Sequence, residues 1–221
     1  MKKLLAFAAG SLISLSVVAA PLLTTPETLS TGLKNTNGLD NPLTFAKFDT
    51  ALGTLTSVHI QLTGYEETGY TATDLGGASN TFVFTNDVTV NLKTLAGDAL
   101  TTVLPTVTDT QTVGANGTYS SAGFPARALT NTVIGPEAVF LDAATLALFV
   151  GPGSITLNTS ATSANSVIGT GDITSTILTR YNATASVWYD YEVPTTPVPE
   201  PTSMALVGLG ALGLAAARRR K

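Results

Sequence analysis

The stretch TFVFTNDVTVNL, residues 81–92, alternates apolar and polar side chains along most of its length. Five apolar side chains share one parity and five polar side chains share the other: Phe82, Phe84, Val88, Val90 and Leu92 against Thr81, Thr85, Asp87, Thr89 and Asn91. A period of two predicts a β-strand with one buried face and one face in water.

The same period recurs along the chain and predicts further strands at 56–62, 155–157, 173–178 and 185–192. Glycine-containing turns separate these segments, and 38 threonines, whose β-branched side chains favour strands, are spread along them. One segment differs: residues 141–149, LDAATLALF, begin with a capping Asp142 and predict a short helix. We therefore expect a mainly β chain folded as an antiparallel β-sandwich over residues 33–193, preceded by a short segment, 20–32.

The amino-terminal residues have the layout of a secretory signal peptide. Lys2 and Lys3 precede the apolar run LLAFAAGSLISLSVVAA, and small residues then meet Pro21. This pattern predicts a signal helix, residues 1–19, that is cleaved after Ala19. An uncleaved amino-terminal anchor is the alternative.

The carboxyl-terminal residues predict a single transmembrane helix. Residues 202–217, TSMALVGLGALGLAAA, carry no charge and are followed by Arg218, Arg219, Arg220 and Lys221, which predict a membrane stop and a cytoplasmic tail, 218–221. A helix of this length reaches roughly 24 Å, less than the roughly 30 Å hydrocarbon core, so the anchor is marginal. GLGALG within it fits the letters of a dinucleotide-binding turn, but a proline-rich stretch precedes it instead of a strand, so we expect these glycines to serve helix packing.

A proline-rich linker, residues 194–201, precedes the apolar segment and ends in Pro199, Glu200 and Pro201. The order of Pro-Glu-Pro, short apolar helix and arginine cluster resembles the PEP-CTERM sorting signal. The resemblance implies that a membrane protease of the exosortase type recognises these three residues and releases or transfers the protein. A chance proline linker before a simple tail anchor is the alternative.

A second resemblance concerns LTFAKFDTALGTLTSVHIQLTG, residues 43–64. It is similar to the opening of the choice-of-anchor E domain of bacterial surface proteins, whose pattern is met here by these residues: Phe48, Asp49, Leu52, Gly53, Thr54, Leu55 and Val58. The resemblance implies a secreted β-domain and supplies no catalytic residues.

Charge and cysteine content exclude several classes of function. Between residues 20 and 198 there are five Lys and Arg against fourteen Asp and Glu, a net charge of −9. An acidic surface repels phosphate backbones, so we expect no nucleic-acid partner. Cysteine is absent, so the core must hold the domain together without disulfides.

The predicted domain offers few residues for chemistry. His59 is the single histidine and has the polar parity of its strand, so we expect a surface histidine without a catalytic or metal-binding partner. Glu66 and Glu67, like Asp190 and Glu192, are expected to be solvated edge charges. The candidate ligand-binding residues are Trp188, which could stack on a sugar, and Asp190 with Glu192, which share a face and could hold a cation weakly. Aromatic residues of strands are also common in cores, so the aromatic group of Trp188, Tyr189 and Tyr191 has that second interpretation. We expect no catalytic residue, no metal and no cofactor.

These patterns predict an exported, exosortase-sorted protein of the cell surface or extracellular matrix, without enzymatic activity and associated with exopolysaccharide or biofilm. Its expected partners are signal peptidase, the sorting protease, the inner membrane as a transient anchor, and exopolysaccharide. A carbohydrate- or cation-binding module is one alternative, and a hydrolase that uses Asp and Glu is another.

Overall fold

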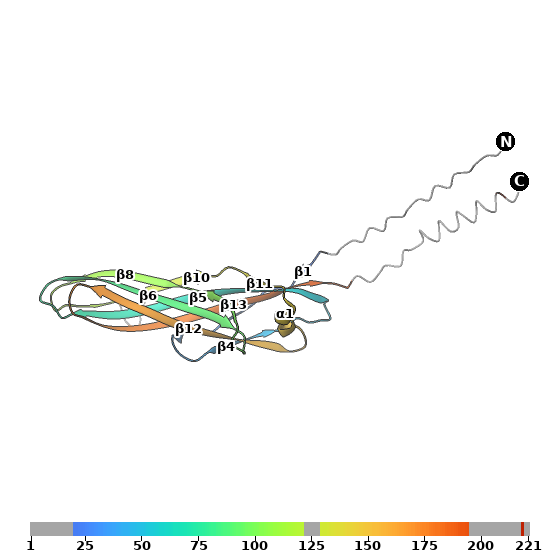
Figure 1. Ribbon diagram of the computed structural model, residues 1–221, viewed down its shortest axis with the longest axis horizontal. Helices are drawn as coiled ribbons and strands as arrows, with labels where there is room; N and C mark the ends of the chain where they lie inside the picture. The colour runs from blue at the N-terminus through green and yellow to red at the C-terminus, as the bar shows by residue number, and fades with distance from the viewer. Residues whose placement is uncertain (1–19, 122–128, 195–217, 219–221) are drawn as a thin grey trace, which may run out of the picture. The chain divides into compact units, whose positions relative to one another are not determined.

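The computed structural model describes residues 20–121, 129–194 and Arg218. Residues Pro21–Glu192 form one compact unit built from two antiparallel β-sheets, as the strand pattern predicted. In Figure 1 the long strands of both sheets lie along nearly the same axis, with neighbouring strands pointing in opposite directions. The predicted signal helix, residues 1–19, lies outside the described residues.

The larger sheet is built around two very long strands, β5 (Thr54–Asp74) and β13 (Ile173–Glu192), which pair with each other along their whole length. Three short strands follow one another along the outer edge of β13: β1 (Leu22–Leu23), β2 (Glu27–Ser30) and β3 (Lys34–Asn35). Three others line the outer edge of β5: β11 (Ala138–Phe140), β10 (Leu129–Ile134) and β9 (Thr118–Ser120). The sheet is thus four strands wide.

The smaller sheet has β12 (Ser154–Gly169) and β6 (Asn80–Lys93) at its centre. Strand β4 (Asn41–Ala46) pairs with the first part of β12. Along its other edge β6 pairs with β7 (Ala99–Val103) and β8 (Thr106–Val113). The alternation in residues 81–92 therefore marked a central strand of this sheet.

The expected parity is confirmed in β6, where Phe82, Phe84, Val88, Val90 and Leu92 are buried, while Val83, at an outward position, is exposed. On β13, Ala185, Val187 and Tyr189 are buried while Trp188 and Asp190 lie on the opposite face. The inward side chains of the two sheets form two apolar clusters. One holds residues such as Ile60, Leu62 and Val90, and the other holds Tyr70, Phe82 and Phe84.

The predicted helix is confirmed as α1 (Ala143–Phe149), whose first free amides are capped by Asp142: its Oδ1 accepts a hydrogen bond from the Thr145 amide at 2.8 Å. Phe149 at the end of the helix is fully buried in the larger apolar cluster. The helix therefore closes one end of the sandwich, beside the start of β5 and β12.

Residues 20–32 are part of the sandwich. They contain β1 and β2, which hydrogen-bond to β13, and Leu29 packs against the core. The compact unit accordingly begins at Pro21, whereas the strand pattern placed the start of the domain at residue 33. Two- and four-residue strands are too short to show a period in the sequence.

Candidate ligand-binding sites

His59 lies on the outer face of the larger sheet between two carboxylates. Its Nδ1 contacts Glu137 Oε1, and its Nε2 is 2.9 Å from Asp190 Oδ2. Only 12% of the histidine side chain is exposed. His59 thus lies at an outward position, as its parity predicted, but it is mostly covered and has two carboxylate partners that the sequence did not indicate. Its partners are 78 and 131 residues away along the chain, where no local pattern could indicate them.

Two further side chains complete this group, which we call the His59 cluster: His59, Glu137, Asp190, Ser57 and Trp188. The Ser57 hydroxyl donates to Asp190 Oδ2 at 2.9 Å and lies 2.8 Å from His59 Nε2. The Trp188 ring stacks on the imidazole, with ring centroids 5.4 Å apart and planes 14° from parallel. Antiparallel pairing explains the cluster, because His59 is directly opposite Trp188 and Ser57 is opposite Asp190.

The carboxylates set the charge of this cluster. Burial opposes a charge on His59, but the hydrogen bonds and negative charges of Glu137 and Asp190 outweigh it, so the pKa of the imidazole lies above its ordinary value of 6.5. With a carboxylate at each ring nitrogen, both nitrogens act as donors to acidic oxygens. The cluster is best described as an imidazolium held by two carboxylates from separate segments of the sheet.

This geometry does not match an activated serine or a metal site. A nucleophilic serine needs a neutral imidazole nitrogen to accept its proton, whereas here the hydroxyl donates to Asp190, which also contacts that nitrogen. Glu137 and Asp190 contact opposite nitrogens of the ring, so their oxygens do not converge on one point. Among the described residues, no three His, Cys, Asp or Glu side chains are arranged so that they could hold a metal ion.

The three predicted ligand-binding residues are only partly brought together. Trp188 and Asp190 are neighbours in the His59 cluster, but Glu192 is exposed and makes no side-chain hydrogen bond within the described part of the chain. One face of the Trp188 ring is occupied by His59, so only its other face and its edges remain for a sugar. The core interpretation applies instead to Tyr189, which is buried, and Tyr191, which packs against the core.

Glu66 and Glu67 point to opposite faces of β5, as neighbours on a strand should, but they are not both edge charges. Glu67 lies outside and pairs with Arg180. Glu66 is fully buried, so that prediction is wrong for it. Its Oε1 accepts hydrogen bonds from Thr68 Oγ1 at 2.7 Å and from Asn86 Nδ2, while its Oε2 has no partner.

The inward positions around Glu66 form a polar layer, which we define as Glu66, Thr68, Asn86 and Thr179. All four side chains are buried, and on each of their strands they lie between residues of the two apolar clusters. Burial raises the pKa of Glu66 above its ordinary 4.5, although the hydrogen bonds from Asn86 and Thr68 oppose this shift. Sequence alternation could not identify the layer, because polar residues at inward positions resemble a break in the strand.

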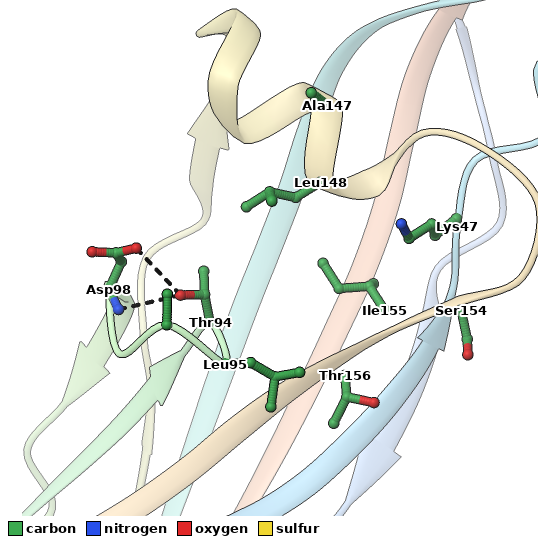
Figure 2. A pocket seen from close by; sticks show the side chains of 10 residues that line it. Lys47, Thr94, Leu95, Asp98, Ala147, Leu148, Ser154, Ile155 and Thr156 are labelled. Atoms are coloured by element: carbon green, nitrogen blue, oxygen red, sulfur yellow. Dashed lines mark hydrogen bonds between the residues drawn. The ribbon is translucent and has the colours of Figure 1, made fainter.

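A pocket of about 530 Å³ lies beside α1. Figure 2 shows Leu148 of the helix, Leu95 of the β6–β7 turn and Ile155 of β12 around it, with Lys47 directed toward Leu148 and Ile155. At the other side of the pocket, the Asp98 carboxylate accepts a hydrogen bond from Thr94 Oγ1 at 3.4 Å and is directed away. A smaller pocket of about 210 Å³, also lined by Lys47, contains Glu27 and Asp49. The sequence patterns indicated neither pocket, because their residues come from separate loops and strand ends.

The predicted sorting residues Pro199, Glu200 and Pro201 and the predicted membrane segment, 202–217, lie outside the described residues. Of the predicted basic stop, Arg218 is described and exposed, and Arg219, Arg220 and Lys221 are not described. Within the part of the chain that the structure describes, no helix is long and apolar enough to cross a membrane.

Comparison with known proteins gives one family match. Residues 197–221 match the family model of the PEP-CTERM protein-sorting motif, as the resemblance predicted. A search of curated proteins gave no match.

Solved structures give only distant likenesses. The structure of the infectious bursal disease virus Gx strain has 13% identity and a TM-score of 0.18, with 84% of this chain and 47% of that chain covered. The VP2 subviral particle of the same virus has 11% identity and a TM-score of 0.16, with 88% and 49% covered. The chain thus spans about half the length of these structures, and at such scores the likeness carries no argument.

The fold and the matched motif define the class of this protein: a mainly β protein that is exported and sorted to the cell surface. More particularly, the motif marks it as a substrate of exosortase, a membrane protease.

Proposed function

We propose that the chain is a non-enzymatic component of the cell surface or extracellular matrix whose β-sandwich contacts exopolysaccharide. The proposed route begins with a signal peptide, 1–19, continues with transient anchoring by residues 202–217, and ends with processing at Pro199–Pro201. The observation that carries the proposal is the sorting motif at 197–221. The similarity of residues 43–64 to the choice-of-anchor E domain supports a surface role for the sandwich.

Two features of the sandwich support a structural role. In the His59 cluster, Glu137 and Asp190 Oδ2 bind the imidazole nitrogens, although the other Asp190 oxygen, Oδ1, is buried without a hydrogen-bond partner. In the smaller pocket, Glu27 Oε2 accepts from the Ala46 amide at 2.8 Å and Asp49 Oδ1 from the Ala51 amide at 2.9 Å. Carboxylates that bind backbone amides are poorly placed for acid–base catalysis, which disfavours the Asp/Glu hydrolase.

A carbohydrate-binding module is the second candidate. The observation that favours it is Trp188, a partly exposed aromatic ring on the open outer face of a sheet, next to the hydrogen-bonding groups of Ser57 and Asp190. If the module interpretation is right, Trp188→Ala should reduce retention of the protein on isolated exopolysaccharide by about tenfold, because one lost stacking contact is worth about 1–1.5 kcal/mol. Tyr65→Ala, on the outer face of β5, is the matched control.

The sorting route is tested by changing Pro199-Glu200-Pro201 to Ala-Ala-Ala in the full chain. We expect export to continue while the unprocessed chain accumulates in the inner membrane, and deletion of the sorting protease should give the same result. Deletion of residues 218–221 should act differently, by weakening the stop that fixes the tail in the cytoplasm.

Changing Pro194-Thr195-Thr196 to alanine, in the same linker but outside the matched motif, is the control and should leave sorting intact. Fractionation with an antibody to the sandwich measures all four forms. Release of the triple-alanine protein at the parent's efficiency would show that residues 199–201 do not direct sorting and that the carboxyl end is a simple anchor.

A further inference from the structure

The pocket beside α1 combines three exposed or half-buried aliphatic side chains with one cation. Leu95 and Leu148 are 69% and 43% exposed, and Ile155 lies between them and Lys47. Such exposed aliphatic surface around a concave site costs free energy in water, which a bound apolar group would recover at roughly 25 cal/mol per Å².

Lys47 has no salt bridge with any described residue, unlike Lys93 and Arg180, which pair with Asp40 and Glu67. Its side chain is half-buried, and its ammonium group is directed over the aliphatic wall. Lys34, which also has no salt bridge with a described residue, is exposed on β3 and does not line the pocket, so Lys47 is the cation of this site. It supplies the pocket with a site for a negative charge.

We propose that this pocket binds a small amphipathic anion, with its hydrocarbon part against Leu95, Leu148 and Ile155 and its anionic headgroup on the Lys47 ammonium. About 530 Å³ is within the usual range for small-molecule pockets. None of the described residues that line the pocket is aromatic, so these residues offer no stacking surface for a sugar, and their aliphatic wall suits an alkyl chain. The ligand class is therefore a single acyl chain with an anionic head, from a free fatty carboxylate or from a membrane lipid.

This site is independent of the proposed sorting route, because none of its lining residues lies in the motif at 197–221. Variants of the pocket should be exported and processed like the parent. A failure of ligand binding would leave the sorting proposal untouched, and a failure of sorting would leave the pocket intact.

The test uses the exported, processed protein, purified without detergent, and decanoate as the soluble probe. Calorimetry should detect binding, and methyl resonances of Leu95, Leu148 and Ile155 should shift. Lys47→Met, which keeps an aliphatic stem but removes the charge, should weaken decanoate binding at least tenfold. Decanol, which has the chain without the charge, should bind the parent and Lys47→Met equally. Leu148→Glu should weaken both probes.

Lys34→Met, on the exposed strand β3, is the matched control and should bind decanoate like the parent. A second arm uses phosphatidylglycerol vesicles: Lys47-dependent sedimentation with them would identify membrane lipid as the source, and decanoate binding alone would identify a free carboxylate. Absence of binding in both arms would overturn the proposal. Equal decanoate binding by Lys47→Met and the parent, or methyl shifts confined to other parts of the sandwich, would also overturn it.

Discussion

At the residue scale, His59 links three segments that are distant in sequence. Glu137 approaches from the loop before β11 and Asp190 from β13, so the charged imidazole joins both neighbours of β5 on the outer face of the sheet. Glu137 is 43% exposed, and water therefore screens its part of the interaction. The cluster is expected to contribute modestly to stability and to make that contribution depend on pH.

The sign of this dependence follows from the raised pKa of His59. A group whose pKa is higher in the folded state than in the unfolded state gives its full stabilisation at pH values below its pKa in the unfolded state, which is 6.5 for His59. This stabilisation is lost as the pH rises through the pKa of the folded state. His59→Gln should therefore lower the free energy of unfolding at pH 6 by about 1 kcal/mol or less. The difference from the parent should shrink as pH rises to 9. Urea unfolding of both proteins across this range measures it, and a difference that grew with pH would contradict the assigned charge.

Glu66 differs from His59 in its position, because its carboxyl group lies inside the core and one of the carboxyl oxygens has no hydrogen-bond partner. The Glu66 carboxyl is neutral below its folded pKa, and ionisation above that value places a charge in a buried layer. Because its pKa is raised from 4.5, the stability that Glu66 contributes is lost as pH rises through the folded value.

Glu66→Gln removes this ionisation and keeps the shape of the side chain. Relative to the parent, the variant should gain stability as pH rises from 5 to 9. The expected gain is at least about 1 kcal/mol, the lower end of the range for leaving a buried polar atom without a hydrogen-bond partner. Glu67→Gln, at the neighbouring outward position, is the control and should show no such gain. A Glu66→Gln difference that is constant over the whole range would mean that Glu66 is not the titrating group.

At the scale of elements, the paired strands β5 and β13 form the centre of the larger sheet. The last residue of β13, Glu192, lies against Gly53, the residue before β5. A Cβ at Gly53 would lie 2.2 Å from the Glu192 carbonyl oxygen, and the residue has φ +153°. Both the close approach and the backbone conformation therefore require glycine. The contact fixes the end of β13, the last strand before the sorting segment.

Gly53→Ala should lower the free energy of unfolding by about 1–3 kcal/mol, because the backbone of β5 or β13 must move to admit the methyl group. Gly77→Ala in the β5–β6 turn is the control, since a Cβ there meets nothing within 4 Å, and it should change stability by less than about 0.5 kcal/mol. Thermal and urea unfolding measure both variants. Equal stability of Gly53→Ala and the parent would show that the strand ends adjust freely.

The sequence predicted β6 well because its inward positions are almost all large and apolar, and it predicted α1 because Asp142 caps an Ala- and Leu-rich segment. It could not show that β5 continues to Asp74. The inward positions in its middle are occupied by Gly64, Glu66 and Thr68, which give no apolar signal. The His59 cluster and the pocket beside α1 were not predictable for another reason: their members meet only through strand pairing and loop placement.

At the scale of the whole molecule, the predicted signal-peptide cleavage site is next to the first residue of the folded unit. The predicted signal-peptide cleavage after Ala19 would leave Ala20 immediately before the compact unit, which begins at Pro21. Cleavage several residues further along would remove β1, whose Leu22 and Leu23 pair with Tyr191 and Asp190 of β13. Amino-terminal sequencing of the exported form should therefore find a start close to Ala20, and a chain that begins at Met1 would contradict cleavage.

The segment 20–32 also protects an edge of the larger sheet. Strands β1 and β2 pair with β13 between Thr184 and Tyr191, Leu29 packs against the core, and Glu27 reaches the Ala46 amide of the smaller sheet. Without these strands, the outer edge of β13 would expose unpaired amides and carbonyls, a surface on which a second chain can add a strand.

A chain of residues 33–192 should therefore be less stable than one of residues 21–192, and it should associate. Loss of the Leu29 packing alone costs about 2 kcal/mol, which lowers Tm by about 4–8 °C in a domain of this size. Both chains should give mainly β circular dichroism spectra, but light scattering should show concentration-dependent dimers only for the shorter one. Leu29→Ala in the 21–192 chain separates the two effects, because it loses the packing while β2 still covers the edge; it should be destabilised yet monomeric. If the 33–192 chain matched the longer one in Tm and stayed monomeric, residues 20–32 would be a dispensable extension, and the fold would begin where the strand pattern alone placed it.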